Sequence, residues 1–104
     1  MVEIITKTYR IENESLSGYE PKTGFRWEAT GINGTITIDD CARVVNYNIN
    51  IDGLYIYDKD GNSINEKVDI EGFKAELADN IRISYDSIVS DIDTHTLINN
   101  YFKG

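Results

Sequence analysis

The sequence predicts an α+β domain in which an antiparallel sheet packs against C-terminal helix in two layers. Apolar and polar residues alternate through the first two thirds of the chain, most clearly over residues 43–52. From Asp69 onward the apolar positions lie three or four residues apart, which is the spacing of one helix face. The 104 residues fit one domain, and no linker or repeat divides them. We therefore expect one domain over 1–104, mainly β-sheet over 1–68 and mainly helical over 69–104.

The sheet is expected to have about four to six strands connected by hairpins. Residues 2–10 form the first candidate strand, with Val2 and Ile4 on one face. The polar stretch 12–24, which contains the only proline, is the best candidate for a long loop.

The next two strands are predicted on either side of a tight turn. Residues 25–31 alternate, and Asn33-Gly34 is typical of a two-residue hairpin. Residues 35–39 continue the alternation as the following strand. The residues expected on the apolar face are Phe25, Trp27, Ala29, Ile36 and Ile38.

Residues 43–52 carry the clearest strand pattern, and Asp52-Gly53 indicates another hairpin before a strand over 54–57. One face of 43–52 is predicted to be apolar: Val45, Tyr47, Ile49 and Ile51. The other carries Val44, Asn46, Asn48, Asn50 and Asp52. In the last strand Leu54 and Ile56 are expected to point inward, and Tyr55 and Tyr57 toward solvent.

The last third is predicted to be helical, with Asp69 as N-cap. One helix over 69–92 would be roughly 36 Å long at 1.5 Å per residue. As an alternative, Asp79-Asn80 breaks the helix and residues 81–85 form a short strand between two helices. A final short helix is expected to start near Asp93 or Thr94.

The charge of the chain bears on its partners. Eighteen acidic and ten basic residues give a net charge of −8. This charge repels nucleic acid and anionic membranes and favours a basic partner, although solubility alone is an alternative explanation. The N-terminus has no apolar leader and Cys41 is the only cysteine, so a cytoplasmic protein without a disulfide framework is expected.

The stretch YDKDGNSINEKVD, residues 57–69, resembles a calcium loop at first sight. Asp58, Asp60 and Asn62 fit the first three ligand positions of an EF-hand. However, Ser63 stands where that loop requires glycine, and the preceding segment alternates like a strand. A hairpin turn built on Gly61 is the simpler interpretation.

The chain shows no strong catalytic or cofactor motif, so we expect a non-enzymatic protein without cofactor or metal. His95 is the only histidine and has no local partner signature. A Cys41–His95 nucleophilic pair and scattered carboxylates leave a hydrolase as a weaker alternative.

The candidate partner-binding residues are acids of the last third and two tyrosines. Seven acids lie between residues 69 and 93 against two bases. Asp79, Asp86 and Asp93 recur every seven residues, which on one helix would form a stripe. The predicted binding residues are Glu76, Asp79, Asp86, Asp91, Asp93, Tyr55 and Tyr57.

In size, charge and character the chain resembles the small acidic proteins with which phages and mobile elements block restriction or CRISPR nucleases. That resemblance implies an inhibitor whose carboxylates replace phosphates in a basic nucleic-acid-binding groove. The alternatives are a self-assembling accessory module that uses a sheet edge or its tyrosines, and a cation-binding domain that uses residues 58–69.

Overall fold

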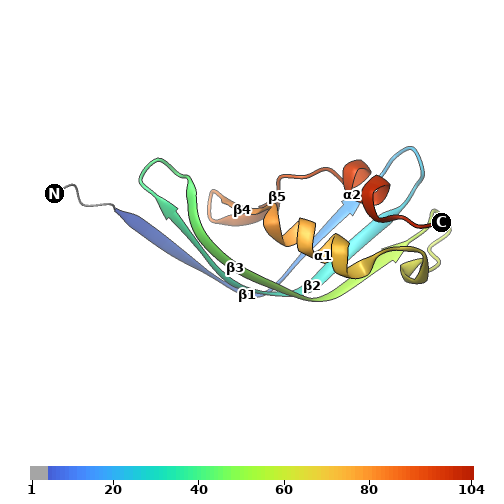
Figure 1. The fold of residues 1–104 in the computed structure, drawn as a ribbon, viewed down its shortest axis with the longest axis horizontal. Helices are drawn as coiled ribbons and strands as arrows, with labels where there is room; N and C mark the ends of the chain where they lie inside the picture. The colour runs from blue at the N-terminus through green and yellow to red at the C-terminus, as the bar shows by residue number, and fades with distance from the viewer. Residues whose placement is uncertain (1–4) are drawn as a thin grey trace.

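The computed structural model describes residues 5–104 and confirms the α+β fold class (Figure 1). Three long antiparallel strands form one sheet in the order β1-β2-β3, and β4 and β5 form a separate hairpin. The strands are β1 (Thr6–Tyr19), β2 (Arg26–Asp39), β3 (Val44–Tyr57), β4 (Ile81–Ser84) and β5 (Ser87–Ser90). The 3₁₀ turn η1 (Asn65–Lys67) and the helices α1 (Ile70–Asp79) and α2 (Thr94–Tyr101) complete the domain.

The three strands of the main sheet are longer than predicted. The predicted loop 12–24 is wrong over most of its length, because β1 continues to Tyr19. The hairpins predicted at Asn33-Gly34 and Asp52-Gly53 are also wrong, since both pairs lie inside strands. The turns lie at 20–25 and 40–43 instead. Val2 and Ile4 of the first predicted strand lie outside the described residues.

Asn13, Gly31 and Asn33 lie at an irregular bend within the sheet and not at a hairpin turn. The β1–β2 register shifts on both sides of Glu14, and Asn13 and Gly31 have positive φ angles of 49° and 62°. The Asn33 side chain joins the two irregular sites. Its Oδ1 accepts the Asn13 N–H at 2.9 Å, and its Nδ2 donates to the Gly31 carbonyl at 3.0 Å. Bulges of this kind raise the local twist and bend of strands.

The bend changes which residues point inward. On β2, Ala29 and Ile32 are both fully buried although they are three residues apart. On β3, Ile51 and Leu54 show the same spacing. The alternation therefore does not run through the bend. The predicted inward faces are correct for Trp27, Ala29, Ile36 and Ile51, but the prediction is wrong at the start of β3, where Val45 and Tyr47 are exposed and Val44 is half-buried against the core because the register shifts there. The prediction for Tyr55 and Tyr57 holds, with Tyr55 exposed and Tyr57 half-buried.

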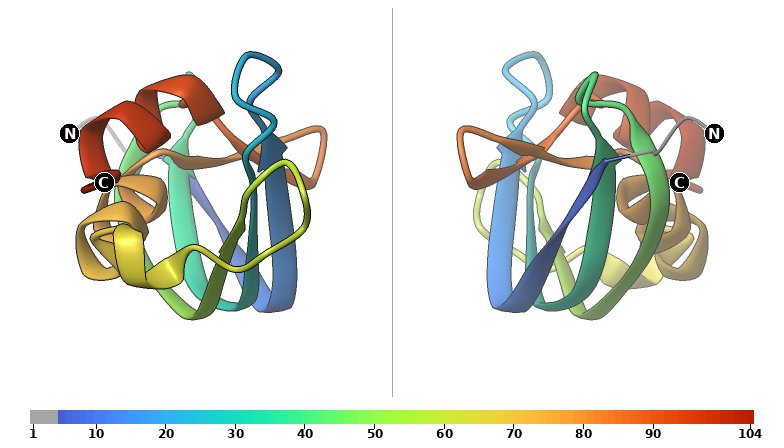
Figure 2. Two further views of the ribbon diagram at one scale, coloured as in Figure 1. Left: turned by 90° about the vertical axis from the view of Figure 1, so that its right-hand side faces the viewer. Right: turned by 90° about the vertical axis from the view of Figure 1, so that its left-hand side faces the viewer.

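The helices cover only one half of the long sheet (Figure 1). The buried core there includes Trp27, Phe73, Leu77 and Leu97. The Trp27 ring meets Phe73 edge-on at 5.9 Å between centroids, and its Nε1 donates to Thr94 Oγ1 at 2.9 Å. End-on, the sheet is strongly curved, with α1 beside β3 and the β4–β5 hairpin lying across the open side toward β1 (Figure 2).

The single helix predicted over 69–92 is wrong, and the alternative break at Asp79-Asn80 is correct. The Asn80 side chain donates to the Glu76 carbonyl at 2.8 Å and so caps the end of α1. The chain then forms the β4–β5 hairpin, whose isoleucines and valine favour strands. The predicted caps hold: Asp69 accepts the Gly72 N–H, and Asp93 caps α2. Within residues 5–104, no helix is long and apolar enough to cross a membrane.

Candidate partner-binding surfaces

Two of the predicted acids lie together on α1. The Glu76 carboxylate accepts Nδ2 of Asn100 on α2, at 3.2 Å to the nearer oxygen. Asp79 Oδ1 accepts the Tyr47 hydroxyl at 2.6 Å, which ties the end of α1 to β3. The hydrogen-bond partners of both carboxylates are neutral groups, so neither carboxylate is paired with a cation through these bonds. We call Asp69, Glu76 and Asp79, together with the adjoining Tyr101, the acidic α1 surface.

The negative charge of this surface contributes to the raised pKa of two tyrosines. The pKa of Tyr101 is raised, first by burial and then by the carboxylates of Glu76, Asp69 and Asp79. The pKa of Tyr47 is raised by its hydrogen bond to Asp79 and by the charge of that carboxylate. A negative neighbour disfavours the phenolate, so both directions indicate a negative potential along α1.

The other three predicted acids do not extend this surface as a stripe. Asp86 lies in the β4–β5 turn, Asp91 forms an ion pair with Arg82, and Asp93 accepts the Thr96 N–H at 2.8 Å. The stripe of Asp79, Asp86 and Asp93 on one helix is therefore wrong, because the chain reverses direction between them.

The predicted tyrosines lie on the outer face of the sheet, opposite the helices. Tyr55 is 47% exposed. The Arg26 guanidinium lies 5.9 Å from the centroid of the Tyr57 ring, within cation–π range. Tyr19 on β1 pairs with Arg26 on β2, and it adds a second exposed aromatic beside Tyr55 that the sequence analysis missed because it placed a loop there. We call Tyr19, Arg26, Tyr55 and Tyr57 the tyrosine face.

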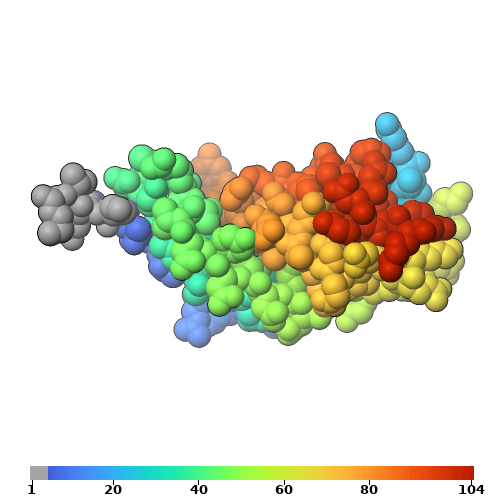
Figure 3. Space-filling model, viewed as in Figure 1, coloured from blue at the N-terminus to red at the C-terminus, as the bar shows by residue number. Residues whose placement is uncertain are grey.

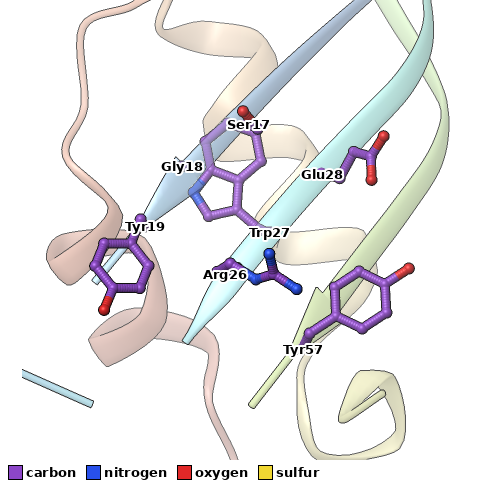
Figure 4. A pocket seen from close by; sticks show the side chains of 7 residues that line it. All are labelled: Ser17, Gly18, Tyr19, Arg26, Trp27, Glu28 and Tyr57. Atoms are coloured by element: carbon purple, nitrogen blue, oxygen red, sulfur yellow. The ribbon is translucent and has the colours of Figure 1, made fainter. Parts of the chain in front are cut away.

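A shallow depression of about 420 Å³ marks the tyrosine face (Figure 4). The Tyr19 ring projects away from the sheet on one side, and Arg26 and Tyr57 lie on the other. Aromatic side chains provide large contact area at small entropic cost, which suits a protein interface.

The segment resembling a calcium loop forms the turn that was predicted. Asp58 Oδ1 accepts the N–H groups of Asp60 and Asn62, both at 2.9 Å, and Gly61 has a φ of 84°. These main-chain hydrogen bonds, the Asn62 bond foremost, hold the pKa of Asp58 below its usual value. The Asn65 amide is also engaged, with main-chain atoms of β3. The turn thus accounts for the polar residues that suggested calcium ligands.

The structure separates Cys41 from His95. Cys41 lies in the turn that follows β2, whereas His95 lies on α2 near the residues that precede β2. The 14-residue strand between them is roughly 45 Å long along its path at 3.3 Å per residue, so the two side chains lie at its opposite ends. The nucleophilic pair considered from the sequence is therefore not formed.

His95 has a different partner that the sequence analysis did not identify. Its Nδ1 lies 2.7 Å from Oε2 of Glu20, a carboxylate that is almost fully buried. The other Glu20 oxygen accepts the Lys22 N–H at 2.9 Å, and His95 Nε2 lies 3.0 Å from Asn99 Nδ2. These bonds fasten α2 to the 20–25 turn. The contact spans 75 residues, so no local pattern predicts it.

Comparison with protein-family models, curated proteins and solved structures finds no match to the chain. The assignment of function therefore rests on the surfaces described above.

Proposed function

We propose that this chain is a non-enzymatic binding protein that docks the acidic α1 surface onto a basic protein partner. The observation that carries the proposal is the cluster of Asp69, Glu76 and Asp79, whose charge acts on Tyr101. A net charge of −8 adds long-range attraction, because a protein's summed field steers oppositely charged partners into contact.

In its specific form, the partner is a nucleic-acid-handling protein such as a restriction or CRISPR nuclease. The chain then acts in the cytoplasm as a phage or mobile-element inhibitor, without a cofactor. Carboxylates of α1 would occupy positions that nucleic-acid phosphates otherwise take in the basic groove. Small size and strong negative charge support this form of the proposal.

Capture of partners from lysate at low and high salt tests the charge argument. The informative variant is Glu76→Gln with Asp79→Asn, which removes two charges and keeps the hydrogen-bond acceptors. Asp60→Asn with Glu66→Gln is the matched control, because these exposed acids lie off the acidic α1 surface. Two ion pairs at about 1 kcal/mol each in water predict a loss of tenfold or more in affinity at low salt for the first variant.

The control variant should bind nearly as well as the wild type, and added salt should weaken all binding. Capture that is indifferent to salt, or equal weakening by both double variants, would contradict docking through α1.

The tyrosine face favours a second candidate function, self-assembly as an accessory module. Three tyrosines from two strands, β1 and β3, lie on one open face there, with Tyr19 57% and Tyr55 47% exposed. Sedimentation velocity would then show oligomers of the chain alone, and Tyr19→Thr with Tyr55→Thr would return it to monomers. A wild-type monomer at high concentration would remove this candidate.

A further inference from the structure

The two halves of the exposed β3 edge differ in whether side chains bind their main-chain groups. Near its C-terminal end, the Asn65 side chain imitates a neighbouring strand: it accepts the Ile56 N–H at 2.7 Å and donates to the Leu54 carbonyl at 2.8 Å. Lys74 Nζ donates to the Asp52 carbonyl at 3.3 Å. These contacts occupy main-chain groups that could otherwise pair with a further strand.

The other half of the edge, residues 44–51, lacks this protection. In the part of the chain that the structure describes, β2 is the only strand that pairs with it. Its sequence, VVNYNINI, contains no charged residue in a chain that is 27% charged. Val45 is 53% and Tyr47 46% exposed.

The opposite edge of the sheet shows how this protein protects a strand. β1 carries Lys7, Arg10, Glu12 and Glu14 along its length, and its pairing is interrupted at Asn13. Charges and bulges are the devices by which natural edge strands avoid unwanted pairing. The stretch 44–51 carries no charge, and its one register shift lies at its start, between Val44 and Asn46, which leaves most of this edge open to a partner strand.

Two hollows lie along the same half of β3, where its atoms lie next to those of α1 and β4 (Figure 3), and we call them together the groove. One hollow of about 370 Å³ lies where Tyr47 faces Asp79 and Ile81. A second, of about 300 Å³, lies between residues 49–51 and the small side chains of Ala75 and Ala78 on α1. An edge strand beside a helix, with small residues between, has the form of a site where an extended peptide adds a strand.

We propose that residues 44–51 of β3 accept an extended, basic segment of the partner as an additional strand. This inference rests on the proposed function and specifies how the partner binds. Main-chain hydrogen bonds would supply affinity, and alternate side chains of the segment would enter the two hollows. Eight residues at about 3.4 Å each give a contact roughly 27 Å long.

The charges around the groove select a basic segment rather than a second copy of the chain. Of the two bases that line it, Arg82 is paired with the Asp91 carboxylate. Lys74 binds the neutral Asp52 carbonyl, and Glu71 lines the same hollow with the opposite charge. Asp79 accepts a hydrogen bond from the neutral Tyr47 hydroxyl, and that bond does not pair it with a cation. Two copies would bring together two chains of net charge −8, whereas a basic segment gains from the same field.

The probe is the blocked peptide Lys-Val-Lys-Val-Lys-Val-Lys, which combines alternation with positive charge. Its comparison is the same peptide methylated at every backbone nitrogen, which keeps the charges and loses the donors. Hydrogen exchange should show protection of the amides of 44–51 with the first peptide only. Calorimetry should show at least tenfold weaker binding of the methylated peptide.

Two lysine variants with equal charge change locate the site. Tyr47→Lys places a cation in the groove, where it can pair with Asp79 and preserve the fold, and should weaken peptide binding at least tenfold. Asn48→Lys, on the outer face of the same strand, should leave binding within about twofold. Thermal unfolding of both variants confirms that they are folded, and the methylated peptide tests the inference on the wild type.

Equal binding of both peptides would overturn the added strand while leaving docking by charge intact. No binding of the unmethylated peptide, or protection outside 44–51, would also overturn it. Protection of 44–51 in the chain alone, with the mass of a dimer, would show that a second copy is the occupant. The salt and Glu76→Gln experiments decide the proposed function separately.

Discussion

The β4–β5 turn offers a direct test of how backbone conformation limits the stability of this domain. Ser84 pairs with Ser87, and the two residues between them, Tyr85 and Asp86, have φ angles of 52° and 65°. Positive φ at both central positions defines a type I′ turn, which favours Asn-Gly. Neither tyrosine nor aspartate relieves the steric conflict of the left-handed region as glycine does.

We predict that Tyr85→Asn combined with Asp86→Gly stabilises the protein. A left-handed conformation costs about 1–2 kcal/mol per ordinary residue, and relief of this strain stabilises the folded state. The new glycine offsets roughly 0.5–1 kcal/mol of that stabilisation, because it loses more conformational entropy on folding. The Tyr85 side chain is 100% exposed, so its removal loses no packing. The net gain should be about 1 kcal/mol, or about 4–8 °C in Tm for a domain of this size.

Thermal and urea unfolding followed by circular dichroism measure the change. Tyr85→Ala is the matched control, since it removes the same ring but keeps an ordinary residue at positive φ, and it should leave Tm nearly unchanged. A double variant no more stable than the wild type would refute the strain argument. An equal rise in Tyr85→Ala would assign the effect to the side chain instead of the backbone.

Three further perturbations test the fold. Gly34→Ala should lower the free energy of unfolding by more than about 1 kcal/mol, because the new Cβ would lie 1.8 Å from the Asn48 carbonyl oxygen. Gly61→Ala is the control: it has open space around it and should lower the free energy of unfolding less, as measured in urea. Phe73→Ala should lower the free energy of unfolding by about 3–5 kcal/mol, because that ring is fully buried. Hydrogen bonding to the Thr96 N–H at the start of α2 lowers the pKa of Asp93 below its ordinary 3.8. The Asp93 carboxylate therefore stabilises the folded state above pH 3.8, and this stabilisation is lost as the pH falls through the lowered pKa. Asp93→Asn keeps the cap without titrating, and its stability should decline less on acidification than that of the wild type; an identical decline would contradict this assignment.

Local patterns predicted the elements whose structure depends on near neighbours. Trp27 and Ala29 point inward as the alternation indicated, and Asp69 caps α1 as its position indicated. The Asp58 turn follows from hydrogen bonds that span only two and four residues. In these places the deciding contacts lie within a few residues, so the sequence pattern contains the necessary information.

The strand lengths could not be predicted in the same way. Asn33-Gly34 is equally suited to a hairpin turn and to an irregular site within a strand. The choice is made by the contact between Asn33 and Asn13, 20 residues away. The spacing of Leu77, Ile81, Ile88 and Ile92 fits a helix, yet the β-branched residues between 81 and 90 favoured the strands that form.

The candidate site was only partly predictable for a related reason. Glu76 and Asp79 lie near each other because one helix carries both. The contacts of Asp91 with Arg82 and of Asp79 with Tyr47 depend on how β4, β5 and β3 pack around that helix. The separation of Asp86 from these acids follows from the same hairpin.

Two departures from local rules occur beside the same groove, and together they favour binding at this end of the sheet. The edge 44–51 carries none of the charges seen on β1, and the hairpin that supplies Ile81 and Arg82 to the groove ends in a strained turn. Local strain lowers stability and unprotected edges allow unwanted pairing, so both tend to be kept where they serve a function. If the Tyr85→Asn, Asp86→Gly variant is more stable but binds the lysine–valine peptide less well, the turn contributes to the groove. If it is more stable and binds equally, the strain serves no role in this site, and the edge alone defines it.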